Sequence, residues 1–215
     1  MNCTAKEIDL ILISYPEFFK GETDLVSSLL DQFDFTYHLR KPDASYDELE
    51  SFLAEIPDHL HEKIVVSNSI EIFERFKVKG IHFSTLNREN GNYLAGNCYR
   101  GTSCHSIDEI RKLDDSYDYV YLSPIFDSIS KPGYKGKLDV YEIKKFLNES
   151  RKIQVHALGG IAAGNMEQIR EFGFDGFAVL GAVWTNDPHQ NQDKIRSNFK
   201  KIYSIIQSIY EKSNS

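Results

Sequence analysis

The sequence has few cysteines and no long hydrophobic run. Only three cysteines occur among 215 residues, Cys3, Cys98 and Cys104, and none belongs to a C-x-x-C motif. An odd number of thiols without C-x-x-C spacing does not predict a disulfide framework, so we expect reduced thiols in a cytoplasmic protein. No apolar stretch approaches the length of a membrane span. The first ten residues carry charged side chains where an export signal needs an apolar stretch, so we expect no such signal.

Excess positive charge and metal-ligand motifs are also absent. The formal net charge is −7, which argues against a nucleic-acid or anionic-membrane partner. No H-E-x-x-H motif, paired aspartate cluster or cysteine–histidine set predicts a tightly held metal. The remaining composition, 41% hydrophobic and 27% charged, is that of an ordinary globular protein with a sizeable core.

Short β-rich runs alternate with helical patterns along the whole chain. Apolar residues recur at helical spacing between most of these runs, and a long closing helix is predicted over 195–210. Asp24, Ser45 and Ser106 are the expected N-caps of three helices, with Ser106 and Glu109 forming a capping box. Segment 87–99 is rich in asparagine and glycine and is expected to be a loop, with or without a single helical turn. The predicted strands are 8–13, 35–40, 63–68, 80–84, 100–104, 119–124, 154–159 and 176–181.

Eight strands in 215 residues predict one closed parallel barrel, a single (β/α)₈ domain over residues 1–215. The competing fold is a doubly wound open sheet, which usually carries a G-x-G-x-x-G turn after its first strand. Here that strand leads into Ser14-Tyr15-Pro16-Glu17 instead. No linker or low-complexity tract marks a domain boundary, so we favour the barrel.

Alternation along each strand predicts which side chains share the barrel interior. One face is apolar, for example Tyr37 and Leu39 in the second strand, and the other carries polar groups such as His38. Because active sites of these barrels lie at the carboxyl ends of the strands, polar inward residues there are site candidates. They are Arg40, Asn68, Ser84, Ser103, His105, Ser123, Ser130 and Lys131.

The strongest local signal is a pair of glycine-bearing loops after the last two strands, Gly159-Gly160 and Gly181-Ala182. Barrels commonly bind phosphate there, because glycine lets the anion approach backbone N–H groups. The alternative is that the glycines only form tight turns. Since two such loops occur in matching places, phosphate binding is the stronger interpretation.

Histidine and lysine side chains follow the middle strands. His105 is placed for acid–base chemistry, because its ordinary pKa lies near neutral pH; otherwise it only leads into the helix capped by Ser106. Cys104 has the opposite parity and is expected to pack against a helix. Ser130 and Lys131 can bind an anion, although that segment alone fits a solvated loop better.

An arginine ends the second strand. Arg40 is costly to bury without a partner, which is either an anionic ligand or a structural carboxylate. His59 and His61 are not spaced to share a helix face, and we expect both at the surface.

Taken together, these segments resemble the thiamine phosphate synthase/TenI family of (β/α)₈ barrels. The resemblance covers most of the chain, and no single segment is diagnostic. The matching segments are His38-Leu39-Arg40, Val66-Ser67-Asn68, Gly80-Ile81-His82-Phe83, Thr102-Ser103-Cys104-His105-Ser106, Ser123-Pro124-Ile125-Phe126 with Ser130-Lys131, Leu158-Gly159-Gly160-Ile161 and Phe177-Ala178-Val179.

The resemblance implies a thiazole phosphate as small-molecule partner. Its phosphate would lie on the two glycine loops, and in a synthase a pyrimidine pyrophosphate would lie near Arg40, Asn68, Ser103 and Lys131. We expect His105, Ser103 and Lys131 to be catalytic. The expected substrate-binding residues are His38, Arg40, Asn68, Ser130, Gly159, Gly160, Gly181 and Ala182.

Three departures from the synthase pattern bear on the reaction. Where the synthase pattern has Asn-Asp after the third strand, this chain has Asn68-Ser69. Asn87 stands in place of the second metal-binding aspartate of that pattern. The Q-L-R-x-K motif of the synthases corresponds to His38-Leu39-Arg40-Lys41-Pro42, which displaces or deletes the lysine. Serine and asparagine are poor neutral replacements for the carboxylates that Mg²⁺ prefers.

The TenI branch also lacks those aspartates yet keeps an S-x-H-S motif, seen here as Ser103-Cys104-His105-Ser106. Its members are tautomerases that aromatise a thiazole carboxylate phosphate without metal, and the resemblance gives His105 the proton transfer. We favour this activity, with no cofactor. The alternatives are a thiamine phosphate synthase that uses Mg²⁺ and a non-catalytic thiamine or thiazole phosphate-binding protein. The sequence leaves the oligomeric state open, a homo-oligomer included.

Overall fold

Eight parallel strands close into a barrel in the computed structural model, which describes residues 9–88, 98–113, 115–126 and 139–213. Each strand pairs with the next, and β1 pairs with both β2 and β8, so the described sheet has no free edge. The strands are β1 Asp9–Ile13, β2 Thr36–Leu39, β3 Ile64–Ser67, β4 Gly80–Phe83, β5 Tyr99–Cys104, β6 Tyr119–Leu122, β7 Gln154–Leu158 and β8 Gly176–Val179.

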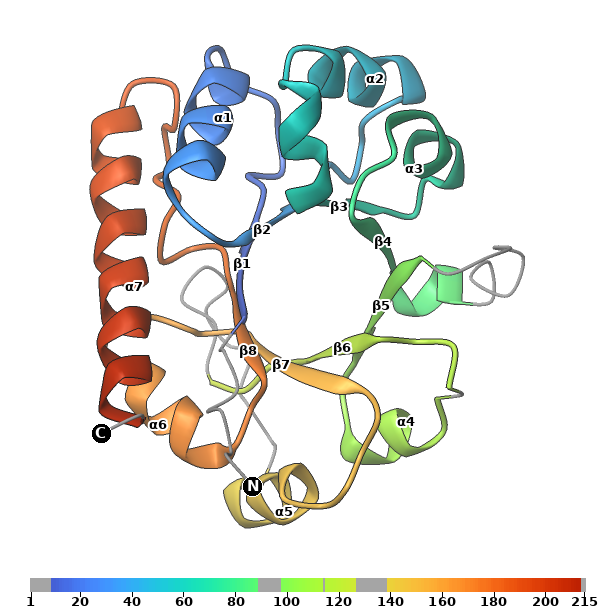
Figure 1. Cartoon of the computed structure of the whole chain (residues 1–215), viewed down its shortest axis with the longest axis vertical. Coiled ribbons are helices and arrows are strands. Elements are labelled where there is room, and N and C mark those ends of the chain that lie inside the picture. The colour runs from blue at the N-terminus through green and yellow to red at the C-terminus, as the bar shows by residue number, and fades with distance from the viewer. Residues whose placement is uncertain (1–8, 89–97, 114, 127–138, 214–215) are drawn as a thin grey trace.

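Helices surround the barrel, and α7 is the longest of those described (Figure 1). The helices are α1 Glu22–Gln32, α2 Tyr46–Ala54, α3 Ile70–Phe76, α4 Ile107–Arg111, α5 Val140–Leu147, α6 Met166–Phe172 and α7 Gln192–Ser213, with a 3₁₀ helix at Asp58–Lys63. The predicted (β/α)₈ barrel is therefore confirmed, and all eight predicted strands are present with ends that agree to within two residues where described.

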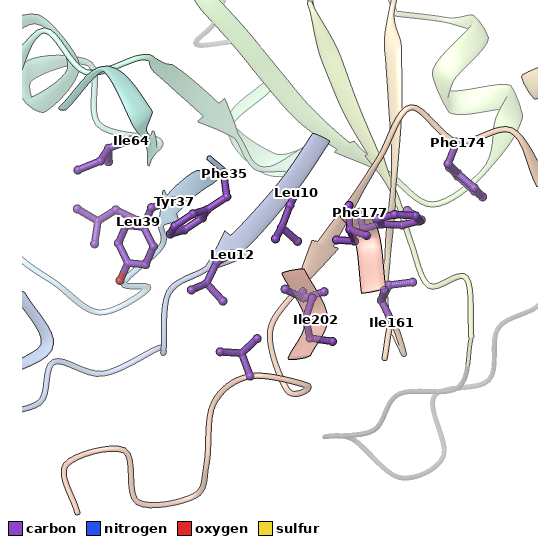
Figure 2. Close-up of a cluster of buried hydrophobic side chains, with 14 of the residues drawn as sticks. Leu10, Leu12, Phe35, Tyr37, Leu39, Ile64, Ile161, Phe174, Phe177 and Ile202 are labelled. Carbon is purple, nitrogen blue, oxygen red and sulfur yellow. The ribbon is translucent and has the colours of Figure 1, made fainter. Parts of the chain in front are cut away.

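The main core lies between the outer face of the barrel and the helices. Leu10, Leu12 and Phe177 project outward from β1 and β8 and lie close to Ile202 of α7 (Figure 2). A smaller cluster fills the barrel itself and includes Ile11 and Tyr121. The parity prediction is thus confirmed in β2, β4, β6 and β7, whose apolar side chains face the helices, whereas β1 contributes the aliphatic Ile11 to the interior.

The helix caps follow the sequence in part. Ser45 forms the full capping box with Glu48, as its S-x-x-E pattern dictates. Ser106 caps α4 by accepting from the N–H of Glu109, but the Glu109 carboxylate accepts from the N–H of His105 instead. The Asp24 prediction is wrong, because α1 begins at Glu22 and Gly21, at φ 81° and three residues before Asp24, takes the cap position.

Candidate active site

The predicted site residues that the structure describes lie at or just inside the carboxyl ends of the strands. Neighbouring strands bring their loops together, and the pairing of Leu158 with Ala178 places the glycine loops after β7 and β8 side by side. Ser130 and Lys131 lie outside the described residues, so their roles stay predictions.

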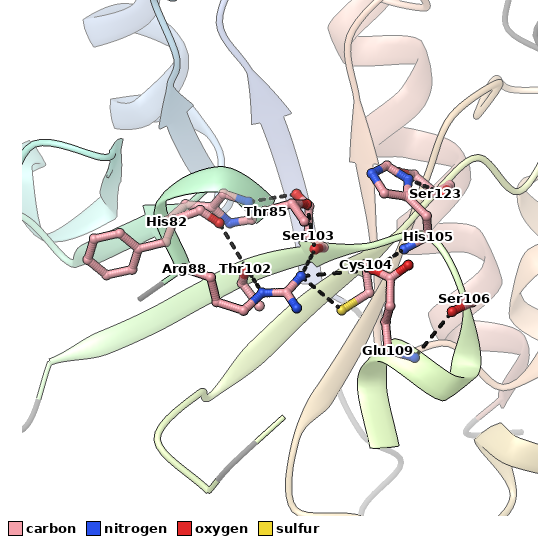
Figure 3. Close-up of polar contacts among 11 residues, drawn as sticks. His82, Thr85, Arg88, Thr102, Ser103, Cys104, His105, Ser106, Glu109 and Ser123 are labelled. Atoms are coloured by element: carbon pink, nitrogen blue, oxygen red, sulfur yellow. Dashed lines mark hydrogen bonds and ion pairs between the residues drawn. The ribbon is translucent and has the colours of Figure 1, made fainter. Parts of the chain in front are cut away.

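His105 stands just beyond β5 with an exposed imidazole. Its Nδ1 lies 2.9 Å from the carbonyl oxygen of Ser123, and its backbone N–H donates to Glu109 Oε2 at 3.1 Å (Figure 3). A carbonyl oxygen can only accept, so Nδ1 carries a proton, and in the neutral ring Nε2 keeps its lone pair. The structure therefore holds one imidazole edge in place and leaves the other able to accept a proton.

Ser103 lies two residues before His105 on the inward face of β5. Its hydroxyl is 2.9 Å from Nε2 of His82 on the neighbouring strand β4 (Figure 3). Cys104, between the two, is fully buried on the helix side, and burial raises the pKa of its thiol to about 11. The prediction that Cys104 packs against the helix layer rather than acting as a nucleophile is consistent with this position.

Arg88 is not among the predicted site residues, yet it contacts the site strand. Its guanidinium donates to the Ser103 carbonyl oxygen at 2.6 Å and to Thr102 Oγ1 at 3.2 Å (Figure 3). Tyr117 donates to the Arg88 carbonyl oxygen. These bonds fasten the segment after β4 onto β5 beneath the mouth, a role that no sequence motif signals.

His38 in β2 and Arg40 just beyond its end lie in different surroundings. His38 is buried inside the barrel, with Nε2 2.7 Å from Ser67 Oγ and Nδ1 3.1 Å from the Tyr121 hydroxyl. Arg40 is exposed at the mouth, and its guanidinium pairs with no carboxylate among the described residues. The anionic ligand predicted for Arg40 therefore has no competing partner in the described part of the chain.

Lys41 points away from the barrel mouth into a buried ion pair. Its Nζ lies 2.7 Å from both carboxylate oxygens of Glu22 in α1 and donates to the Glu17 carbonyl oxygen at 2.9 Å. Tyr37 also donates to Glu22, at 3.1 Å. Lys41 is thus committed to joining β2 to α1, which keeps it from replacing the displaced lysine of the synthase pattern.

The two positions after β3 hold neutral oxygen atoms that are already engaged. Asn68, at φ 57°, accepts a hydrogen bond from the N–H of Ser84 through Oδ1 at 2.9 Å. Ser69 is the N-cap of α3 and accepts from the N–H of Ile72. Mg²⁺ favours carboxylate oxygens in octahedral geometry, so this donor set fits the ion poorly.

The loop after β7 has the backbone shape that glycine permits. Gly159 and Gly160 have φ values of 94° and 68°, and a Cβ on Gly159 would come within 2.8 Å of Pro124 Cα. Asn165 holds the loop by donating to the Gly160 carbonyl oxygen and accepting from the N–H of Ala162. The loop is thus held in shape by its own hydrogen bonds. Phosphate binding by Gly159 and Gly160 stays a prediction.

The loop after β8 turns directly over its strand end. The N–H groups of Val183 and Trp184 both donate to the Leu180 carbonyl oxygen. Gly181 and Ala182 lie at the outside of this turn, and their N–H groups have no backbone acceptor in the described part of the chain. These N–H groups can therefore donate to a phosphate, and the role of Gly181 and Ala182 as phosphate ligands stays a prediction.

The fold and a comparison with known protein families together show the class of protein to which this chain belongs. The polar mouth of a closed (β/α)₈ barrel is the active-site face of barrel enzymes. The family model described as "Thiamine monophosphate synthase" matches residues 10–183. This chain belongs to the thiamine phosphate synthase/TenI family and is a thiamine-biosynthesis enzyme of that family.

Its relatives carry the synthase name. A thiamine-phosphate synthase of Anoxybacillus flavithermus is 26% identical over 153 residues, 70% of this chain and 68% of the relative. One from a Psychrobacter species is 23% identical over 181 residues, 80% of this chain and 84% of the relative. The crystal structure of a thiamine phosphate pyrophosphorylase from Bacteroides thetaiotaomicron superposes with a TM-score of 0.79 at 29% identity, covering 93% and 98% of the two chains. No described helix is long and apolar enough to cross a membrane.

Proposed function

We propose that this protein is a metal-independent tautomerase that aromatises a thiazole carboxylate phosphate. The observation that carries the proposal is the fixed tautomer of His105, whose Nδ1–H is held by the Ser123 carbonyl oxygen while Nε2 is left basic and exposed. Such a group can take a proton from one atom of a bound ring and return it to another. A positioned histidine typically contributes about 10²–10⁴-fold to such a step.

The loss of metal-binding groups supports the same choice. Ser69 and Asn68 offer only engaged neutral oxygens, and Lys41 is paired with Glu22. Departure of pyrophosphate needs its negative charge to be neutralised, whereas proton transfer on a monophosphate does not. The altered positions therefore disfavour the synthase reaction more than the tautomerase reaction.

The expected ligand contacts follow from the positions of the loops. The substrate phosphate would lie on Gly159, Gly160, Gly181 and Ala182, and its carboxylate would face the exposed guanidinium of Arg40. Ser103 and His105 would then face the ring from β5.

The decisive experiment assays the purified enzyme with the thiazole carboxylate phosphate tautomer in the presence of EDTA. Turnover is expected to persist with EDTA and to fall by about 10²-fold or more in His105→Ala. Unchanged turnover in His105→Ala would remove the proposed mechanism. Binding without turnover would point to a carrier protein instead.

The second candidate is a divergent thiamine phosphate synthase, favoured by the names of the relatives. It predicts Mg²⁺-dependent formation of thiamine phosphate from the pyrimidine pyrophosphate and the thiazole phosphate. The same protein preparation assayed with millimolar Mg²⁺ distinguishes the two. Product formation there, together with no tautomerase turnover, would establish the synthase.

A further inference from the structure

Ser67, the last residue of β3, lies beside the exposed arginine of the barrel mouth and is not among the predicted site residues. The pairing of β2 with β3 ends at Leu39 and Val66. The next residues, Arg40 and Ser67, therefore leave the two strands side by side. Alternation turns both side chains inward, because Leu39 and Val66 belong to the core outside the barrel. Ser67 is half-buried and Arg40 is exposed, so both are accessible from the mouth.

The positive charge of Arg40 acts on the interior of the barrel. Burial, followed by the charge of Arg40, lowers the pKa of His38 to about 3. For His82 on β4, burial comes first again, followed by the charges of His38 and Arg40, and the pKa lies well below its usual range. Ser14, just beyond β1, holds the backbone of Arg40, accepting from its N–H at 2.9 Å and donating to its carbonyl oxygen at 2.8 Å. Arg40 thus supplies positive charge to the part of the mouth that Ser67 lines.

A buried histidine holds the hydroxyl of Ser67. His38 Nε2 lies 2.7 Å from Ser67 Oγ, and Nδ1 on the opposite edge of the ring lies 3.1 Å from the hydroxyl of Tyr121 on β6. The exposed fractions of His38 and Tyr121 are 1% and 2%. Ser67 is therefore the member of this set that reaches the mouth, and its orientation is set from inside the barrel.

The two hydroxyls that contact His38 differ in acid strength and in access to water. At a pKa of about 3 the imidazole is neutral at pH 7, so it has one N–H and one acceptor nitrogen. The hydroxyls of Tyr121 and Ser67 compete for that nitrogen. The phenol is the stronger acid, and its proton is buried, whereas the Ser67 proton can find water or a ligand at the mouth. Tyr121 therefore donates to Nδ1, and Nε2–H donates to the Ser67 oxygen.

Ser67 consequently presents its hydroxyl proton to the mouth. Because its oxygen already accepts from His38, a ligand meets Ser67 as a hydrogen-bond donor. The guanidinium of Arg40 beside it adds further N–H donors and a full positive charge. Donors with one positive charge suit a carboxylate, whose oxygens only accept.

A similar arrangement on β5 lies farther from the arginine. His82 Nε2 is 2.9 Å from Ser103 Oγ, and His82 Nδ1 is 3.1 Å from the hydroxyl of Tyr119 (Figure 3). Ser67 is on the strand next to that of Arg40, whereas Ser103 is three strands away from it. Ser67 is therefore the serine of the two that can share one anionic group with Arg40.

We propose that Ser67 and Arg40 together bind the carboxylate of the thiazole carboxylate phosphate. His38 acts through Ser67 and is a positioning residue, which keeps the Ser67 hydroxyl a donor. The assignment deepens the proposed function and rests on it, because the carboxylate is the group that distinguishes the tautomerase substrate from the thiazole phosphate of a synthase. Ser67 is then a residue that determines specificity.

Two ligands that differ by the carboxylate test this subsite. Calorimetric titration compares the aromatic thiazole carboxylate phosphate with thiazole phosphate. We expect the wild type to bind the carboxylated ligand about tenfold or more tightly. Ser67→Ala should lose about tenfold of the affinity for that ligand, whereas Ser67→Thr keeps a hydroxyl and should retain it. The affinity for thiazole phosphate should be the same in all three proteins.

Ser69→Ala is the matched control, because it removes a hydroxyl two residues further along the chain. The Ser69 hydroxyl accepts from the N–H of Ile72 at the start of α3. We expect this variant to be less stable to heat but to keep the wild-type ratio of the two affinities. An equal loss of affinity for both ligands in Ser67→Ala, or no loss for either, would overturn the proposal.

The positioning role of His38 has its own measurement. Nitrogen-15 NMR of the wild-type protein should show a neutral His38 protonated on Nε2 from about pH 5 to about pH 8. His38→Leu removes the donor to Ser67 and should lower the affinity for the carboxylated ligand alone. His38→Gln can still donate through its amide and should restore part of that affinity. A His38 protonated on Nδ1 would refute the positioning role.

These outcomes separate the subsite from the proposed function. A carboxylate preference that is lost in Ser67→Ala, together with no tautomerase turnover, would support the subsite and refute the reaction. Turnover without any preference for the carboxylated ligand would support the reaction and refute the subsite. If Ser67→Ala fails to fold, the ligand preference of the wild type and the tautomer of His38 still decide.

Discussion

The imidazole of His105 and the main chain of Ser123 are joined by a hydrogen bond of 2.9 Å between Nδ1 and the carbonyl oxygen. The bond links the end of β5 to the end of β6, two strands that pair directly. It fixes both the ring orientation and the tautomer of this exposed histidine at the end of β5. Positioning and proton transfer are thus carried by opposite edges of the same ring.

Replacing His105 by asparagine separates these two roles. The side-chain amide of the variant can still donate to the Ser123 carbonyl oxygen, but it has no basic nitrogen to replace Nε2. We therefore expect His105→Asn to keep the thermal stability and phosphate affinity of the wild type while kcat falls by about 10²-fold or more. Calorimetry and steady-state kinetics check this, and a variant that loses affinity rather than kcat would show that His105 mainly shapes the site.

The buried histidines predict a loss of stability at acidic pH. The folded-state pKa of His38 is about 3 and that of His82 is also lowered, so below about pH 6.5 the unfolded chain binds protons that the folded chain does not. Stability should fall from about pH 6.5 downward, by about 1.4 kcal/mol per pH unit for each histidine. Urea unfolding at about pH 7.5 and about pH 5.5 measures it. His38→Gln should reduce this pH dependence, whereas exposed His59→Gln should leave it as in the wild type.

The Lys41–Glu22 pair predicts a large and reversible stability defect. Lys41→Met leaves a buried carboxylate without its cation and should cost about 3–5 kcal/mol. Adding Glu22→Gln removes the charge and keeps an acceptor for Tyr37, so the double variant should regain most of this loss. Substrate KM in the double variant should match the wild type. A single variant that is stable but binds substrate poorly would instead make Lys41 a ligand residue.

Two glycines in one loop give a matched test of the phosphate site. Gly159→Ala forces a Cβ within 2.8 Å of Pro124 Cα at a positive φ, which should cost about 1–3 kcal/mol and weaken phosphate binding. Gly164→Ala meets no atom within 4 Å and should change stability by less than about 0.5 kcal/mol. Titration with inorganic phosphate and thermal unfolding check both. Equal phosphate affinity in the two variants would show that anion binding does not depend on the conformation of this loop.

The sequence predicts the barrel well because the information is local. Strand length, alternation and the order of elements can each be recognised from a few consecutive residues. The predicted bounds of each strand therefore agree with the structure to within two residues where described. Helix starts are less local. Asp24 has the right chemistry for a cap, but α1 begins at Glu22, whose buried carboxylate is needed by Lys41 and Tyr37.

Partners across the barrel could not be predicted. Alternation places His38 and Tyr121 on inward faces, but the bond between them depends on where β2 and β6 lie across the closed sheet. His61 illustrates the same limit, because the surface prediction is wrong. Its ring is buried and contacts the carbonyl oxygens of Leu53, Ile56 and Phe76, which belong to neighbouring elements.

The glycine loop after β7 is tied to the start of the segment after β6. Ile125 and Phe126 donate their N–H groups to the carbonyl oxygens of Leu158 and Gly159, and Pro124 fills the space beside Gly159. A change in either segment is therefore felt by the other. If only one of these two segments were exchanged for that of a relative, it would no longer fit the other. A change of substrate specificity at this end of the barrel therefore requires both segments to change together.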